Sequence, residues 1–226
     1  MQELLEKIFP NTMDKLPEFG KSIVDTLIML GISGVISFFL GVFFGVILVI
    51  TQKGGILQNK IVYKILDILV NFFRGIPFVI LLTWIMPVTR GIVGTSIGIK
   101  GAIVPLVFGT VPFFARQVQS ALLEIPSGVI EASKAMGLSP LAIIFKVYLK
   151  EGIPSIARAT TLTSISLLGL TAMAGAVGAG GVGDFAIRYG HNRFQEDVTW
   201  ASVIVIVVIV SVLQIIGDII VRKNTH

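Results

Sequence analysis

The stretch from Leu27 to Ile50 contains no charged side chain. At about 1.5 Å per helical residue it is long enough to cross the roughly 30 Å hydrocarbon core of a bilayer. Backbone groups in lipid must be satisfied within the chain, so the stretch is expected to be a helix. Further stretches of this kind predict an all-α integral membrane protein, one domain over residues 1–226. Its five spans are expected at about 22–50, 68–88, 97–122, 156–178 and 198–221.

Composition excludes several classes of protein. The chain is 54% hydrophobic and 14% charged, whereas a soluble domain is about a quarter charged. The net charge of +5 comes from basic residues spread over several loops, which argues against a nucleic-acid partner. There is no cysteine, and His191 and His226 lack partners at ligand spacing. We therefore expect no metal and no cofactor in this chain.

Two glycine motifs resemble nucleotide-binding loops but lack the required context. The run Gly20-Lys21-Ser22 ends like a P-loop, yet Lys15 stands where the first glycine is needed. Glycines 178, 180 and 183 match a dinucleotide fingerprint but follow a membrane span instead of a strand. We expect neither nucleotide site here, and we expect that the chain is not an enzyme.

Residues 124–154 form the longest charged segment between the apolar segments. Residues that typically begin and end helices divide it, and they predict two short helices joined by a fixed turn, which we call the corner. Ser127 is expected to cap the first helix, and Gly137 to end it in the left-handed conformation. Ser139 is expected to cap the second helix, with Pro140 in its first turn. Gly152 and Pro154 are expected to stop it.

The second helix carries apolar residues at helical spacing, and this stripe requires an apolar cover. It could lie on a bilayer surface as an interfacial helix. We favour the alternative, a docking element. The stripe consists of Leu138, Leu141, Ala142, Phe145, Tyr148 and Leu149.

The triplet Glu131-Ala132-Ser133, followed by Gly137 and by Ile153-Pro154, resembles the EAA loop of ABC-importer permeases. Ser133 stands where that family has a second alanine, and Ile153 where leucine is usual. The resemblance implies that the loop docks in a cleft of a cytoplasmic ATPase. The implied coupling residues are Glu131, Ala132, Ser133, Lys134, Gly137, Leu138 and Pro154.

Longer runs resemble methionine ABC-importer permeases: residues 122–137 (LLEIPSGVIEASKAMG), 170–184 (LTAMAGAVGAGGVGD) and 188–192 (RYGHN). The resemblance implies the type I permease fold with a cytoplasmic coupling helix, in a bacterial plasma membrane. It also implies a homodimer in contact with lipid, two ATPase subunits that hydrolyse ATP, and an extracytoplasmic substrate-binding (lipo)protein.

The distribution of basic residues predicts the orientation of the chain. Five spans place the termini on opposite sides of the membrane. With the N-terminus outside and the C-terminus cytoplasmic, the inner segments carry more lysine and arginine than the outer ones. This orientation puts residues 124–154 in the cytoplasm, as the family resemblance requires.

The fourth span is the polar one, and we expect it to line a pathway. Its hydroxyl groups include Thr163, Ser166 and Thr171, although such hydroxyls more often bond back to their own helix. Its glycines permit an unwound end. Met173, where hydroxyls give way to glycine, is expected to form a gate between two copies, with a core methionine as the alternative.

Three other functions stay open from the sequence. One is an ABC permease for a different small amino acid or a peptide. Another is an ion-coupled secondary transporter, although the spans offer few buried ionisable residues for coupling. The third is a membrane scaffold without transport activity.

Overall fold

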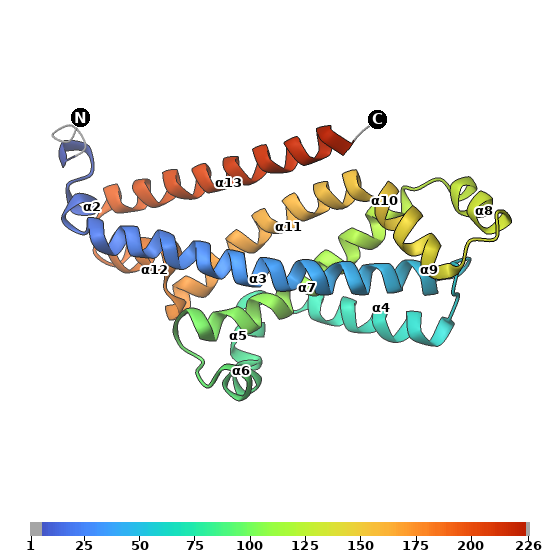
Figure 1. Cartoon of the computed structure of the whole chain (residues 1–226). Helices are drawn as coiled ribbons and strands as arrows, with labels where there is room; N and C mark the ends of the chain where they lie inside the picture. Colours follow the sequence, from blue (N-terminus) through green and yellow to red (C-terminus); the bar gives the residue numbers. More distant parts are fainter. Residues whose placement is uncertain (1–5, 225–226) are drawn as a thin grey trace. The chain divides into compact units, whose positions relative to one another are not determined.

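The computed structural model describes residues 6–224, so His226 lies outside the described residues. Every element among the described residues is helical, and Figure 1 gives their order. The elements are α2 (Pro10–Asp14), α3 (Leu16–Thr51), α4 (Lys60–Gly75), α5 (Phe78–Trp84), α6 (Met86–Val93), α7 (Gly98–Leu123), α8 (Ser127–Ala135), α9 (Pro140–Ile143), α10 (Leu149–Glu151), α11 (Ile153–Ala174), α12 (Gly181–Phe185), α13 (Glu196–Asn224) and the π-helical turns η1 (Ile144–Tyr148), η2 (Gly175–Ala179) and η3 (Ala186–His191).

Four helices are long and apolar enough to cross a membrane: α3, α7, α11 with η2, and α13. The pair α4 and α5 is a fifth candidate, bent by 105°. Only 6% of the most apolar window of α13 is buried within the chain. Its valines and isoleucines therefore face outward, as expected where the surrounding solvent is lipid.

The second apolar stretch differs from the single span expected at 68–88. Asn59 caps α4 by accepting from the backbone N–H groups of Ile61 and Val62. The helix ends at Gly75 because Ile76, which precedes Pro77, adopts an extended backbone with φ −87° and ψ 122°. Proline disfavours the helical conformation in the residue before it. The stretch is therefore broken at this point, where the sequence predicts only a bend.

The chain groups into two compact units. The first contains Met1–Val35, Pro77–Val107 and Ser164–Leu213, and the second contains Ile36–Ile76, Phe108–Thr163 and Gln214–His226. Helices α3, α7, α11 and α13 contribute residues to both units.

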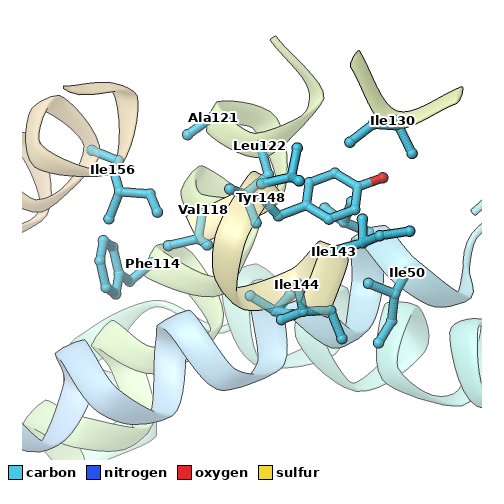
Figure 2. Packing of buried hydrophobic residues seen from close by; sticks show 14 residues of the cluster. Ile50, Phe114, Val118, Ala121, Leu122, Ile130, Ile143, Ile144, Tyr148 and Ile156 are labelled. Carbon is cyan, nitrogen blue, oxygen red and sulfur yellow. The ribbon is translucent and has the colours of Figure 1, made fainter. Parts of the chain in front are cut away.

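The core of the second unit joins α7, the end of α3 and the helices after α8. In Figure 2 the buried ring of Tyr148 lies beside Leu122. Glycines on α3 let α7 approach closely, because a Cβ at Gly45 would lie 2.6 Å from Cβ of Val118. The buried members are Val46, Val49, Ile50, Phe114, Val118, Ala121, Leu122, Ile130, Ile143, Ile144, Val147, Tyr148, Ile156 and Ala159.

The first unit has two apolar clusters. One consists of Met29, Ala102, Leu106, Leu167, Ala174 and Ala179. The other consists of Phe19, Phe185, Tyr189, Val198 and Ala201. The start of α12 is tied to α3 by a buried hydrogen bond of 2.8 Å, which the backbone N–H of Val182 donates to Oγ1 of Thr26.

Candidate functional site

The corner after α8 is a glycine-terminated helix end. Gly137 has φ +77°, which confirms the left-handed conformation expected for it. The N–H of Leu138 donates to the carbonyl of Ser133 at 3.2 Å, and the N–H of Gly137 donates to the carbonyl of Lys134 at 2.9 Å. This pair of bonds defines the Schellman motif, which satisfies the last carbonyl groups of a helix and fixes its exit direction.

The second helix begins as predicted, but the first does not. Ser139 caps α9 by accepting from the N–H of Ala142 at 3.3 Å, with Pro140 in the first turn. The prediction that Ser127 caps α8 was wrong. The cap position belongs to Pro126, whose backbone is extended with φ −57° and ψ 132°, and Ser127 is already the first helical residue.

The second helix ends where the sequence predicts, because α10 ends at Glu151 with Gly152 as its C-cap. The backbone of Gly152 has φ −77° and ψ −7°, and α11 begins at the next residue. The carbonyl of Gly152 accepts from Ile156 N–H at 2.8 Å in the first turn of α11. A glycine is needed because a Cβ here would lie 2.5 Å from the carbonyl oxygen of Tyr148.

The apolar stripe on residues 138–149 divides between two faces. Tyr148 is buried together with Ile144, but Leu141 and Phe145 are 66% and 65% exposed. The π-helical turn η1 accounts for the difference, because an i to i+5 turn inserts a residue and shifts the register of the stripe. The inner face anchors the segment, and the outer face stays uncovered within this chain.

We call the uncovered face the coupling surface and define it by six exposed residues. Four are apolar, and Met136 is the most exposed of them at 72%. Two are charged and lie on α8. The six are Val129, Met136, Leu141, Phe145, Glu131 and Lys134. Exposed apolar side chains on a segment that also carries charges of both signs are suited to docking a folded partner.

The structure places the sequence-predicted coupling residues in different environments. Ala132 and Gly137 are exposed next to the coupling surface, as are Glu131 and Lys134 within it. Ser133 is buried, and its Oγ donates to the carbonyl of Val129 at 2.7 Å. Leu138 packs against the core of the second unit, and Pro154 is half-buried in the first turn of α11.

A pocket of about 250 Å³ opens beside Val129, where α8 begins. Two carboxylates line it, Glu124 and Glu151. Ser155 Oγ donates to Oε2 of Glu124 at 2.5 Å, which fixes one of them in place. Carboxylates in such a hollow can accept hydrogen bonds from a basic side chain. The sequence did not predict this pocket, because its residues come from two separate stretches, 121–129 and 151–155.

A polar network on the second unit also went unpredicted. Arg116 Nη2 donates to Oδ1 of Asp67 at 2.5 Å and to Oδ1 of Asn71 at 3.1 Å. Its Nη1 donates to Oε1 of Gln119 at 2.7 Å, and Gln119 Nε2 donates to Oε1 of Gln52 at 3.4 Å. The network ties α7 to α4 and to Gln52, the residue that follows α3. Only the signs of Asp67 and Arg116 hinted at it in the sequence.

The predicted pathway residues fall on two sides of the fourth span. Met173 is 50% exposed, and Ser166 is exposed on the same helical face. Thr171 is buried, and its hydroxyl donates to the carbonyl of Leu168 at 2.7 Å, the alternative weighed for such hydroxyls. Thr163 is also buried, and its Oγ1 has no hydrogen-bond partner. Glycine 169 continues the exposed face between Ser166 and Met173.

After Met173 the helix ends in a glycine-rich turn. Val177 leaves the helical conformation, and Gly178 has φ 93°. Gly175 and Gly183 come so close that a Cβ at either would lie within 2.6 Å of backbone atoms of the facing segment. The unwound end agrees with the expectation from the glycines, and the turn is tightly packed. Among residues 6–224, no group of three potential metal ligands is present.

Comparison with known proteins places this geometry in context. Residues 37–224 match the model of the family described as "Binding-protein-dependent transport system inner membrane component". A probable D-methionine transport system permease protein of Vibrio cholerae is 47% identical over 89% of each chain. The methionine import system permease protein of Bacillus subtilis is 43% identical over 96% of this chain and 97% of its own.

Solved structures agree with these relatives. A chain of the methionine ABC transporter MetNI in an inward-facing conformation matches with a TM-score of 0.92 and 45% identity. The match covers 94% of this chain and 99% of that one.

Proposed function

The chain belongs to the family of binding-protein-dependent transport system inner membrane components, and from this we propose that it is the membrane-spanning subunit of an ATP-driven importer for methionine. It is a transport subunit, and ATP is hydrolysed on a separate partner. The substrate follows from the names of the relatives, which are 43–51% identical to this chain.

The coupling surface carries the proposal. Its four exposed apolar side chains project from a corner that the Schellman motif and the Ser139 cap hold rigid. A rigid corner can transmit a movement of the ATPase to α11, because a single residue, Gly152, separates α10 from α11. We assign docking to Glu131, Ala132, Lys134 and Gly137. Ser133, Leu138 and Pro154 hold the segment from within.

We further propose that two copies of the chain enclose the pathway. Five candidate spans are few to surround a solute, and a two-fold pair is the commonest solution. The exposed face of α11 with Ser166 and Met173 is the surface that would meet its symmetry mate. Met173 forms the gate. Thr163 and Thr171 support this helix from its buried side.

The proposed orientation has the N-terminus outside and the C-terminus in the cytoplasm, in a bacterial plasma membrane. It is supported by the excess of basic residues in the inner segments. The outer segments then face an extracytoplasmic methionine-binding protein, in keeping with the family's description. The exposed valines and isoleucines of α13 contact lipid.

Uptake by the reconstituted complex tests the proposal. Proteoliposomes containing this chain and its ATPase should accumulate labelled methionine when binding protein and ATP are supplied on the appropriate sides. An ATPase without its catalytic glutamate provides the matched control and should give no uptake. Methionine accumulation that follows an ion gradient and ignores ATP would overturn the proposal in favour of a secondary transporter.

A further inference from the structure

Three cations surround the ring of Tyr189, which is buried at the end of the first unit. The Cζ atoms of Arg193 and Arg188 lie 4.7 and 4.8 Å from the ring centroid, and Nζ of Lys15 lies at 5.4 Å. All three distances are within the range of cation–π attraction. The phenol donates to Oε2 of Glu18 at 2.6 Å, and Phe185 packs on the ring at 5.0 Å between centroids. Tyr189 is therefore a fixed platform for the guanidinium of Arg193.

Phe194, the next residue along the chain, is 89% exposed. It has φ 57°, the one positive value outside glycine among the described residues. Bulky side chains disfavour this conformation, so an ordered structure must impose it. Two backbone hydrogen bonds impose it. Phe194 N–H donates to the carbonyl of His191 at 3.3 Å, and Gln195 N–H donates to the carbonyl of Gly190 at 3.0 Å.

The loop is also held against α13. A Cβ at Gly190 would lie 2.3 Å from Oγ1 of Thr199, so only glycine allows this approach. The structure thus holds a large apolar ring in solvent on a strained but well-supported backbone. Strain at such a position is a signal of function.

The charges around the loop differ in how they are satisfied. Glu18 accepts from Tyr189, Asp184 pairs with Arg188 at 3.2 Å, and Asp197 accepts from Asn11 and Thr12. Glu196 is an exposed carboxylate at the first residue of α13. Arg193 is exposed and has no carboxylate within salt-bridge distance among residues 6–224. Its planar fork, stacked on Tyr189, is available to a carboxylate of a partner.

We infer that Arg193 and Phe194 form a docking contact for the extracytoplasmic methionine-binding protein, whose surface offers an apolar socket beside a carboxylate. The inference rests on the proposed function and orientation, in which the loop after the fourth span is extracytoplasmic. Exposed aromatic and arginine anchors are the residues that dominate protein interfaces. Charge complementarity selects a partner with an acidic group over a neutral one.

The test measures binding of the purified methionine-binding protein to the assembled complex of permease and ATPase, in detergent and in lipid nanodiscs. Phe194→Asn removes the ring but keeps a residue that tolerates positive φ, so the loop should persist. We expect the Kd to rise at least about tenfold in both environments, as for an interface anchor. Arg193→Glu should slow association and reduce its dependence on salt.

Ile97→Asn is the matched control. Ile97 is 76% exposed, lies on the same side in the proposed orientation, and undergoes the same chemical change. Its variant should bind like the wild type, and all variants should keep the basal rate of ATP hydrolysis. As a second measurement, Phe194→p-benzoylphenylalanine retains an aromatic ring and should cross-link to the binding protein on illumination.

Unchanged affinity of Phe194→Asn would overturn the contact, as would a cross-link joining two copies of the permease. A loss confined to nanodiscs would assign the two residues to the lipid surface and likewise overturn it. The outcomes above test only the docking contact, because they compare variants with the wild type. The proposed function is tested separately with the wild-type complex, and it would fail if that complex took up methionine without ATP or without any binding protein.

Discussion

Gly45→Ala tests the close approach of α3 to α7. The added Cβ would lie 2.6 Å from Cβ of Val118 and 2.8 Å from the backbone carbonyl oxygen of Ala115. Ordinary contacts between such atoms are about 3.5–4.0 Å, so the two helices must separate by nearly 1 Å. A rotamer change at Val118 cannot relieve the contact with the carbonyl oxygen, because that atom belongs to the backbone.

The expected magnitude is the difference between two effects. Overpacking a close contact costs about 1–3 kcal/mol. Replacing a helical glycine by alanine returns about 0.5–1 kcal/mol through backbone entropy. The net loss of unfolding free energy should therefore be about 1–2 kcal/mol. Gly31→Ala is the control on the same helix, because nothing lies within 4 Å of its added Cβ. It should gain about 0.5–1 kcal/mol.

The free energy of unfolding of both variants can be measured by reversible unfolding in mixed micelles, followed by the fluorescence of the two tryptophans. Adding Val118→Ala to Gly45→Ala should restore only part of the loss, because alanine keeps the Cβ atom at 2.6 Å and the contact with the carbonyl oxygen of Ala115 also remains. If Gly45→Ala proves as stable as Gly31→Ala, the packing of α3 on α7 described above is incorrect.

Four further outcomes are expected. Glu131→Lys should leave membrane insertion intact but reduce co-purification of the ATPase and methionine uptake at least about tenfold, because it reverses a charge on the coupling surface. Gly137→Val places a β-branched residue at φ +77°, at a cost of about 1–2 kcal/mol, and should weaken ATPase association, whereas Gly128→Val, with open space around it, should not. Met173→Cys should cross-link two copies in the resting complex, and Met173→Ala should raise uncoupled ATP hydrolysis; a tight alanine variant without a cross-link would move the gate elsewhere. The hydrogen bond to Glu18 and burial raise the pKa of Tyr189, so its contribution to stability is complete below about pH 10, the ordinary tyrosine value, and falls as the pH rises toward the folded-state value; Tyr189→Phe should remove this alkaline loss in pH-dependent unfolding.

In residues 124–154, the features that depend only on residues close in the sequence could be predicted. The left-handed Gly137 and the Ser139 cap follow from side chains within a few positions of each other, and both were confirmed. Ser127 failed as a cap because proline and serine are both suited to a helix start, and sequence alone does not decide which of them is outside.

Features that depend on contacts distant in sequence were not predicted. Periodicity placed Leu141 and Phe145 on one stripe with Tyr148, because nothing in residues 140–151 indicates the π-helical turn that separates the exposed residues from the buried one. The Arg116 to Asp67 pair joins residues 49 positions apart, and the sequence contained many other possible pairings. The cations around Tyr189 likewise come from two distant segments.

The exposed apolar residues of the coupling surface also bear on the life of the subunit before assembly. In the proposed orientation, a newly inserted copy presents Met136, Leu141 and Phe145 to the cytosol until the proposed ATPase contact covers them. Exposed apolar patches that lack their partner promote aggregation. We therefore expect a permease without its ATPase to aggregate more readily than the assembled complex.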